Sequence, residues 1–386
     1  MPAGRRIAVF MGTRPEAIKL APVVASLERA ADLVPVVVTT GEHREMFRPV
    51  AELFGFSFHA DLGVMRPNQS LAQVSARLLL RIDQWLQRGR PDLALVQSDT
   101  TTVLSAVLAC HYRRVPIGHV EAGLRTGNVW SPFPEEANRR LASPLVSIHL
   151  APTHVARQNL LREGIDAASI EVTGNTVIDA LVMEVDRQRE PHIREDVHRR
   201  LPDLVAPDWD RVPFVLITAH RRENFGGGFG QICHAIAALA ARFRDHRFIY
   251  PLHLNPNVRG PVRRRLGATT NVALIEPLDY RLFVALMNAC RLILTDSGGV
   301  QEEAPSLAKP VLVMRDTTER PEGVAAGSAL LTGPIAERIV HHTTRLLTDR
   351  DAYRRRAQTA HQYGDGKASE RIVARLRRFF AAQTPA

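Results

Sequence analysis

The chain has 386 residues, which is too long for one ordinary hydrophobic core and sufficient for two domains. Hydrophobic residues make up 45% and charged residues 23%, a composition typical of soluble globular proteins. The net charge is +10, but the basic residues are spread along the chain and not interleaved with aromatic residues, which argues against nucleic acid as a partner. No apolar segment approaches the length of a membrane span, so no membrane partner is expected either.

Cys110, Cys233 and Cys290 are widely separated and lie in apolar helical patterns. They are expected to be free core residues in a reducing compartment, which points to the cytoplasm. The apolar run near the N-terminus is short and leads into a polar motif, so it is interpreted as a first strand rather than a signal peptide.

The predicted first strand, residues 7–11, is followed by Gly-Thr-Arg-Pro-Glu at residues 12–16. Thr13 and Glu16 predict a capping box, and Pro15 suits the first turn of a helix. Arg14 and Lys19 are cations at the start of that helix, where the dipole disfavours positive charge unless an anion is near. Both are therefore predicted to face a phosphate or a catalytic centre.

Two carboxylates follow strands that are expected to be neighbours. Predicted strands at residues 93–96 and 117–120 end shortly before Asp99 and at Glu121. An N-cap of the next helix is the alternative interpretation of Asp99. Because both should face one crevice that the loop carrying Glu135 can reach, the three carboxylates are predicted to have separated pKa values, so that one takes a proton and another gives one. No third ligand joins His119 and Glu121 at a metal-site spacing, so no metal is expected.

The second half repeats the alternation of strands and helices. Residues 191–213, rich in Pro and Arg, are expected to carry short helices and to lie between the two domains or early in the second one. The predicted strand at residues 214–217 ends near His220, which lies beside Arg221 and before a glycine turn. A lone histidine is usually structural, but this position favours a role facing phosphate or substrate. The loop at residues 276–283 is expected to stack on a flat base.

Residues 292–322 predict a strand, a glycine turn, a helix and a second strand. Gly298 and Gly299 would let a phosphate approach the N-H groups at the helix start, and Glu302 and Glu303 could accept hydrogen bonds from neighbouring hydroxyls. The alternative is an ordinary turn whose acidic residues complement the helix dipole. Arg320, after the next strand, favours a nucleotide-diphosphate clamp.

The predicted fold class is therefore α/β, with two Rossmann-like domains facing a cleft. We assign residues 1–176 plus 365–386 to an N-terminal domain that carries the carboxylates. Residues 177–364 form the C-terminal domain that carries the phosphate turn.

Seven motifs then occur in order: GTRPE at 12–16, GEHREM at 41–46, HVEAGLR at 119–125, PFPEE at 132–136, AHRREN at 219–224, HLNPN at 253–257 and the stretch 296–322. Together they resemble the non-hydrolysing UDP-N-acetylglucosamine 2-epimerases over nearly the whole chain. The resemblance implies a glycosyltransferase-B-like architecture, a C-terminal helix that returns to the first domain, and a homodimer. It also implies interconversion of UDP-GlcNAc and UDP-ManNAc for surface polysaccharide synthesis, without a cofactor.

The resemblance carries site residues over by motif. It implies that the catalytic residues are Asp99, Glu121, Glu135 and His220. It implies that the UDP-sugar is bound by Arg14, Lys19, Ser297, Gly298, Gly299, Glu303 and Arg320, with Leu278 and Phe283 at the uracil.

The chemistry agrees with this resemblance. Carbon 2 of the sugar has no adjacent carbonyl to acidify its hydrogen, and no dinucleotide fingerprint follows the first strand, so neither simple deprotonation nor oxidation is expected. Elimination of UDP to a glycal, followed by re-addition, is the remaining route. The alternatives are a hydrolysing relative that releases N-acetylmannosamine and UDP, a glycosyltransferase on the same scaffold, and a non-catalytic UDP-sugar sensor.

Two departures from the family pattern are visible. Ser98 occupies the position before Asp99 where relatives commonly have glycine. Glu42 and Glu45 stand where some relatives use glutamines to bind a second, activating UDP-GlcNAc. Because acidic groups repel a diphosphate, no such activation is predicted.

Overall fold

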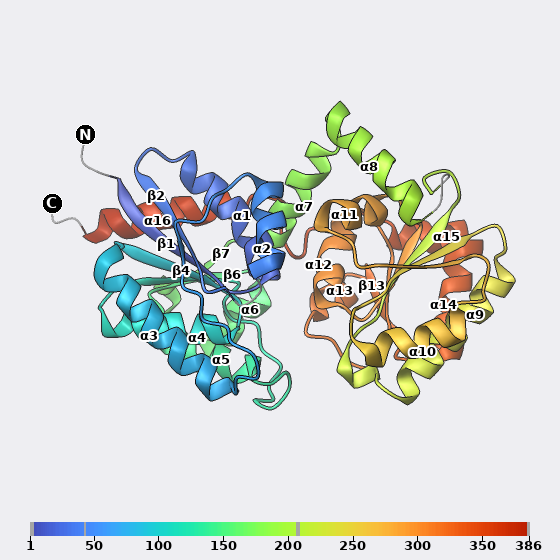
Figure 1. Ribbon diagram of the computed structural model, residues 1–386, viewed down its shortest axis with the longest axis horizontal. Coiled ribbons are helices and arrows are strands. Elements are labelled where there is room, and N and C mark those ends of the chain that lie inside the picture. Colours follow the sequence, from blue (N-terminus) through green and yellow to red (C-terminus); the bar gives the residue numbers. More distant parts are fainter. Residues whose placement is uncertain (1–3, 42–43, 206–208, 384–386) are drawn as a thin grey trace. The chain divides into compact units, whose positions relative to one another are not determined.

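The computed structural model describes residues 4–41, 44–205 and 209–383 (Figure 1). The chain forms two compact α/β units. The first runs to Ala180 and takes up the chain again from Tyr363, and the second comprises Leu181–Gln362. Each unit is built on its own parallel sheet, which confirms the predicted pair of Rossmann-like domains.

The first unit holds a seven-stranded sheet in the order β3-β2-β1-β4-β5-β6-β7. Its strands are β1 (Arg5–Met11), β2 (Leu33–Thr39), β3 (Ala60–Asp61), β4 (Leu93–Gln97), β5 (Ile117–Val120), β6 (Ile148–Ala151) and β7 (Ile170–Val172). Its helices are α1 (Arg14–Glu28), α2 (Arg44–Phe54), α3 (Leu71–Gly89), α4 (Thr101–Tyr112), α5 (Glu135–Ala142), α6 (His154–Arg162), α7 (Thr176–Arg187, which continues into the second unit) and α16 (Ala368–Gln383), with short turns η1 (Ser143–Leu145) and η2 (Ala167–Ser169).

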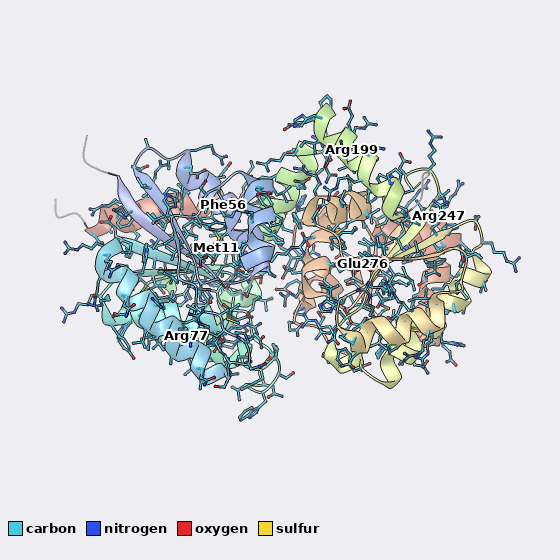
Figure 2. All side chains as sticks on the ribbon, in the orientation of Figure 1. Met11, Phe56, Arg77, Arg199, Arg247 and Glu276 are labelled. Atoms are coloured by element: carbon cyan, nitrogen blue, oxygen red, sulfur yellow. The ribbon has the colours of Figure 1, made fainter. Side chains whose placement is uncertain are left out.

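Helices cover both faces of this first sheet. Alternate residues of a strand face opposite ways, and Ala8 and Phe10 of β1 join a core with Leu78 and Ile82 of α3. On the other side α1 packs beside α2 and α16. Met11, the last residue of β1, is fully buried (Figure 2). The continuous apolar runs of these strands therefore follow from burial on both faces.

The second unit repeats the plan with a six-stranded sheet in the order β10-β9-β8-β11-β12-β13. Its strands are β8 (Phe214–Thr218), β9 (Arg247–Pro251), β10 (Val272–Ile275), β11 (Leu292–Thr295), β12 (Val311–Val313) and β13 (Ala329–Leu331). Its helices are α8 (Pro191–Leu204), η3 (Arg222–Asn224), α9 (Gly227–Arg242), α10 (Pro256–Leu266), α11 (Tyr280–Ala289), α12 (Gly298–Ser306), α13 (Pro321–Ala325), α14 (Ala336–Thr348) and α15 (Arg350–Arg356).

One local prediction is wrong. The stretch at residues 191–213 holds one helix, α8, in its described part rather than several short ones. Pro191 occupies the first turn and Pro202 the last, where a missing N-H and a fixed φ are tolerated better than in the middle of a helix. The number of prolines alone therefore predicted more helix breaks than the described part of this stretch contains.

The last helix is fastened within the first unit. Asp179, on α7, accepts hydrogen bonds from the N-H groups of Ala368 (3.2 Å) and Ser369 (2.7 Å) at the start of α16. The N-H of Asn175 donates to the carbonyl of Tyr363 at 2.6 Å. The chain therefore leaves and re-enters the first unit through two segments that are bonded to each other.

Two predictions about the chain as a whole can be compared with the structure. Cys110, Cys233 and Cys290 are free and buried, as predicted. Within the described ranges, no helix combines the length and the apolar character that crossing a bilayer requires.

Candidate active site

The predicted site residues gather where the strand order reverses in each sheet. In the first unit this point lies between β1 and β4, and in the second it lies between β8 and β11. Open α/β sheets bind ligands beyond the carboxyl ends of their strands at such switch points. Asp99 follows β4, whereas His220 follows β8 and Ser297 follows β11. Both sheets therefore present polar residues where the fold favours binding.

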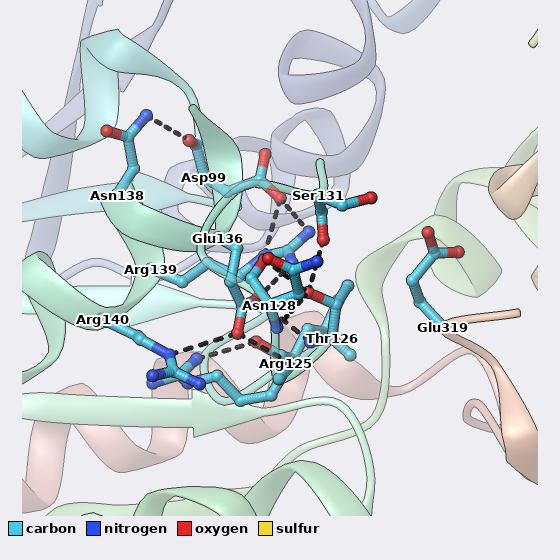
Figure 3. Close-up of polar contacts among 12 residues, drawn as sticks. Asp99, Arg125, Thr126, Asn128, Ser131, Glu136, Asn138, Arg139, Arg140 and Glu319 are labelled. Carbon is cyan, nitrogen blue, oxygen red and sulfur yellow. Dashed lines mark hydrogen bonds and ion pairs between the residues drawn. The ribbon is translucent and has the colours of Figure 1, made fainter. Parts of the chain in front are cut away.

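Asp99 is held by an arginine. Its Oδ2 accepts a hydrogen bond from Nε of Arg139 at 2.9 Å and another from Nη2, while its carbonyl accepts one from Asn138 at 2.8 Å (Figure 3). The N-cap of α4 is Thr100, whose hydroxyl accepts from the N-H of Val103. The alternative interpretation of Asp99 as an N-cap is therefore wrong, and its side chain serves an ion pair instead.

Glu121 lies on the neighbouring strand end, because β4 and β5 pair in parallel as predicted. Its side chain is only 2% exposed and Oε1 contacts Nζ of Lys19 at 2.5 Å. The same oxygen accepts a hydrogen bond from Asn175 at 3.0 Å, and Oε2 accepts one from Gln97. A buried carboxylate with a cation and two amides around it is fixed in one orientation.

The backbone is left-handed at both strand ends. Ser98 has φ of 72° and Glu121 has φ of 63°, which are costly for residues with a side chain. The ring Nε2 of His119 donates a hydrogen bond to the carbonyl of Ser98 at 2.7 Å. His119 is buried, and burial lowers its pKa to about 4, so the ring is neutral at pH 7. This bond supports the strained turn that carries Asp99.

The strain at Ser98 predicts that Ser98→Gly stabilises the fold. Glycine adopts a positive φ without the cost of about 1–2 kcal/mol that other residues incur, although it adds entropy to the unfolded chain. We expect the free energy of unfolding in urea to rise by about 0.5–1 kcal/mol. The same change at Ser75, inside α3, should lower it by a similar amount. A lower free energy of unfolding in Ser98→Gly than in the wild type would contradict backbone strain at Ser98.

Acid should destabilise the fold through His119. Its pKa is about 4 folded against about 6.5 unfolded, so the unfolded chain binds more protons between these values. The stabilisation is complete above pH 6.5 and is lost as pH falls towards 4. From pH 7.5 to 5.0 we expect the wild type to lose about 2 kcal/mol more than His119→Gln in urea unfolding. His111→Gln, at an exposed histidine, should behave as the wild type does.

The loop after β1 is organised by Glu16. This buried carboxylate accepts hydrogen bonds from the N-H groups of Gly12 (2.7 Å) and Thr13 (2.6 Å). The bond from Thr13, together with the one that the Thr13 side chain accepts from the N-H of Glu16, forms the predicted capping box. Its other oxygen accepts one from the hydroxyl of Thr100 at 2.7 Å, so it joins the loops after β1 and β4. Arg14, half-buried, begins α1 from this fixed loop.

The loop before α5 is fixed by Glu136, next to the predicted Glu135. Glu136 accepts hydrogen bonds from the N-H groups of Thr126 (3.1 Å) and Gly127 (3.2 Å) and from Arg139 at 3.0 Å (Figure 3). Burial alone would raise its pKa, but these bonds outweigh burial and lower it. Glu135 is half-buried, and its Oε2 is shielded from solvent without a hydrogen-bond partner among the described residues. Of the two acids, Glu135 is therefore the one with an oxygen that lacks a hydrogen-bond partner among the described residues.

In the second unit a buried carboxylate shapes the loop after β8. Asp296, fully buried after β11, accepts hydrogen bonds from the N-H groups of His220 (2.9 Å) and Arg221 (2.8 Å) and from the amide of Asn224 (3.1 Å). Burial lowers the pKa of His220; the charge of Asp296 opposes this shift, and Arg221 and His253 add to it. The ring of His220 stacks on His253 with centroids 5.3 Å apart.

The Ser-Gly-Gly turn forms the start of α12, as predicted. Ser297 is the N-cap, and Gly298 and Gly299 are the first two helical residues. The N-H of Ser297 is held by the hydroxyl of Thr295 at 2.9 Å. The first N-H groups of a helix have no partner within it and attract anions.

Two guanidinium groups converge on this helix start. A side chain at Gly298 would come within 3.4 Å of Cζ of Arg320 and 3.6 Å of Nη2 of Arg221. Nε of Arg320 donates to Glu302 at 2.7 Å, which orients its guanidinium. Nε of Arg221 is buried without a hydrogen-bond partner in the described part of the chain. Arginine forks match paired phosphate oxygens, so the chemistry of this turn suits an anion.

Next to this turn lies a partly apolar segment. Tyr280 donates its hydroxyl to Oε1 of the buried Glu303 at 2.6 Å and so fastens the start of α11 to α12. Leu278 is buried just before α11, and Phe283 is half-buried on its first turn. Glu302, expected to bind hydroxyls, instead pairs with Arg320.

Arg315 joins two loops of the second unit. It is buried and bonds both Glu223, beside the His220 loop, and Glu319, beside Arg320. Burial would raise the pKa of Glu319, but the bond and charge of Arg315 lower it to about 2. The loops that present Arg221 and Arg320 therefore share one anchor.

Comparison with known proteins identifies the family. The family model described as UDP-N-acetylglucosamine 2-epimerase matches residues 25–377. The UDP-N-acetylglucosamine 2-epimerase of Escherichia coli is 49% identical over 373 residues, 96% of this chain and 98% of that protein. The Bacillus subtilis protein of the same name is 44% identical over 96% of this chain and 94% of its own. A crystal structure of UDP-GlcNAc 2-epimerase from Neisseria meningitidis bound to UDP-GlcNAc superposes with a TM-score of 0.91, at 46% identity over 97% of this chain and 100% of that one.

The chain belongs to the UDP-N-acetylglucosamine 2-epimerase family.

In this epimerase-family chain, sequence reasoning missed the partners of the predicted residues. They are Glu16, Arg139, Asn175 and Asp296, together with Arg221 beside the start of α12. A signal existed for Asp296, which directly follows an apolar strand, and for Arg139, which stands one helical turn after Glu136. Asn175 lies 54 positions from its partner Glu121, and no spacing indicates that contact.

Two further predictions for this epimerase-family chain concern activation by a second UDP-GlcNAc and the binding of metal ions. Glu42 and the side chain of Glu45 lie outside the described residues, so the expectation that no second UDP-GlcNAc activates stays a prediction. Over residues 4–41, 44–205 and 209–383, no group of three or more His, Cys, Asp or Glu side chains is arranged to hold a metal ion.

Proposed function

We propose that this protein interconverts UDP-GlcNAc and UDP-ManNAc as a non-hydrolysing 2-epimerase. The observation that carries the proposal is the set of polar residues at the switch point of each unit. The second unit supplies Arg221, Arg320 and the start of α12 for an anionic diphosphate. The first unit supplies Asp99 in a fixed orientation for proton transfer and Glu121, which holds Lys19. Membership of the family supports the choice of nucleotide sugar.

The reaction proceeds by elimination and re-addition. A carboxylate removes the proton from carbon 2, the electrons of that C-H bond form a double bond between carbons 1 and 2, and the bond from carbon 1 to the UDP oxygen breaks with its electrons going to UDP. A proton is then delivered to the other face of carbon 2 while UDP returns to carbon 1. The cations Arg14 and Lys19 offset charge on the leaving diphosphate.

The contacts support different roles for the three carboxylates. Both oxygens of Glu121 are engaged, by Lys19 and by amides. Asp99 engages Oδ2 with Arg139, and Oδ1 accepts no hydrogen bond from the described residues. Because a proton carrier needs an available oxygen, we assign proton transfer to Asp99 and Glu135, and to Glu121 the control of Lys19. The backbone N-H of His220 donates to Asp296, which directly precedes the N-cap of α12. We assign His220 to the reacting sugar or its diphosphate.

The second unit binds the nucleotide in this proposal. Ser297, Gly298 and Gly299 present N-H groups to the diphosphate, and Arg320 adds a forked donor. Glu303 is assigned to the ribose and Leu278 with Phe283 to the uracil. Tyr280, which holds Glu303 in place, connects the two assignments.

Incubation with UDP-GlcNAc alone tests the function. Proton NMR of the mixture should show both nucleotide sugars at a constant ratio and no free sugar. An incubation that starts from UDP-ManNAc should reach the same ratio. Accumulation of N-acetylmannosamine and UDP would favour the hydrolysing alternative. Product that forms only with an added acceptor would indicate a glycosyltransferase, and binding without turnover would indicate a sensor.

A homodimer in the cytoplasm completes the proposal. The free, buried cysteines suit a reducing compartment, and the family resemblance supports the dimer. Light scattering should give twice the 42.9 kDa mass of one chain. A mass of one chain at micromolar concentration would contradict the dimer.

A further inference from the structure

A second basic cavity lies in the second unit, on helices that the proposed site does not use. It has a volume of about 280 Å³ and is lined by residues of α14, α15, β13 and the turn before β13. Leu330, Leu346 and Ala352 contribute apolar surface, and His342, Arg345 and Arg355 contribute polar groups. Arg356 completes the lining from the end of α15. A concave surface with an apolar floor and convergent polar groups is the form of small-ligand sites.

The positive charge of this cavity is poorly compensated. Several arginines elsewhere in the chain pair closely with carboxylates, as Arg371 does with Asp365 at 2.7 Å. Arg355 has no hydrogen bond or ion pair with any residue of the described chain. Arg356 bonds only a backbone carbonyl, that of Gly327 at 2.7 Å, within the same ranges.

The remaining cation of the cavity has one distant partner. Nε of Arg345 lies 4.0 Å from Oδ2 of Asp349, which is the longest distance that counts as an ion pair. Burial lowers the pKa of Arg356, and the charges of Arg345 and Arg355 lower it further. Asp349 is the carboxylate that offsets part of the charge of Arg345 and Arg355, and three guanidinium groups against one carboxylate leave a positive potential that an anion would neutralise.

We propose that this cavity binds a small phosphate-bearing anion, inorganic phosphate or diphosphate. Guanidinium forks match phosphate oxygens, and the volume lies at the lower end of the roughly 300–1,000 Å³ of ligand pockets, which favours a small anion over a nucleotide. The proposal is independent of the proposed epimerase activity. It concerns α14 and α15, whereas the diphosphate turn lies on α12.

The cavity is connected to the segment that carries Arg320. Gly327, whose carbonyl Arg356 binds, lies just after α13, and α13 begins directly after Arg320. The hydroxyl of Ser328 donates to the carbonyl of Gly323 within the same segment at 3.1 Å. An anion that orders Arg356 would therefore also order the chain around α13.

Calorimetric titration of the full-length protein with phosphate and with diphosphate tests this site. Arg345→Gln with Arg355→Gln removes two cavity charges from exposed positions, so the fold should persist. Arg350→Gln with Arg354→Gln removes two charges from α15 outside the cavity lining and is the matched control. We expect saturable binding that weakens at least about 10-fold in the cavity variant and less than about 2-fold in the control.

Thermal unfolding gives a second readout. At about ten times the dissociation constant, phosphate should raise the Tm of the wild type by about 3 °C and that of the cavity variant by less than about 1 °C. Sodium chloride at equal ionic strength should give no such difference. Equal binding by both double variants, or equal stabilisation by chloride, would overturn the proposal. UMP that binds more tightly than phosphate and is likewise lost in the cavity variant would overturn the preference for a small inorganic anion over a nucleotide.

Discussion

Asp99→Asn should reduce turnover of UDP-GlcNAc by about 100- to 10,000-fold, the range that a positioned proton carrier contributes. The variant keeps an oxygen that can accept from Arg139, so the fold and the orientation of the side chain should persist. It loses the ability to take a proton at Oδ1. Rates from the NMR assay, with urea unfolding as a measure of stability, check both parts of this expectation.

The control for this variant is Asp83→Asn. Asp83 also pairs with an arginine, Arg113, but lies on the exposed surface of α3. Its variant should turn over substrate as the wild type does. UDP binding, measured by calorimetry, should be unchanged in both. Turnover by Asp99→Asn within about 3-fold of the wild type would remove Asp99 from the chemistry.

Arg221→Met should weaken UDP binding by about 10- to 150-fold, corresponding to about 1.5–3 kcal/mol for charge-assisted hydrogen bonds. Methionine keeps the length of the side chain and removes its donors. The hydrogen bond from Arg221 to Asp296 comes from the backbone N-H, so the substitution leaves it in place. Titration calorimetry with UDP measures the loss without requiring turnover.

An exposed arginine provides the comparison. Arg244→Met, beyond the end of α9, changes net charge equally and should leave UDP affinity within about 2-fold. A similar loss in both variants would mean that the overall charge, rather than the α12 turn, attracts the diphosphate. Undiminished affinity in Arg221→Met would place the diphosphate elsewhere.

The placement of Asp99 and Glu121 at one edge of the sheet was predictable from sequence, because the carboxyl ends of parallel strands lie at the same edge. Asp99 and Glu121 each follow an apolar run, and β4 and β5 are neighbours as expected. The Ser-Gly-Gly turn was predictable for the same reason, since glycines between a strand and a helix indicate backbone N-H groups available for an anion.

The pairing of charges was not predictable. Three carboxylates were expected to perturb one another, yet Asp99 pairs with Arg139 and Glu121 with Lys19. Which face of α5 is buried decides the first pair, and tertiary packing sets that face. The left-handed backbone at Ser98 was also hidden, because serine rarely adopts it without support such as the bond from His119.

Solvent deuterium tests the elimination chemistry most directly. Wild-type protein incubated with UDP-GlcNAc in deuterated water, and stopped well before equilibrium, should give UDP-ManNAc with deuterium at carbon 2 in nearly every molecule. Removal of the carbon-2 proton by a side chain requires this exchange. UDP-ManNAc that retains the original hydrogen at carbon 2 would contradict the account.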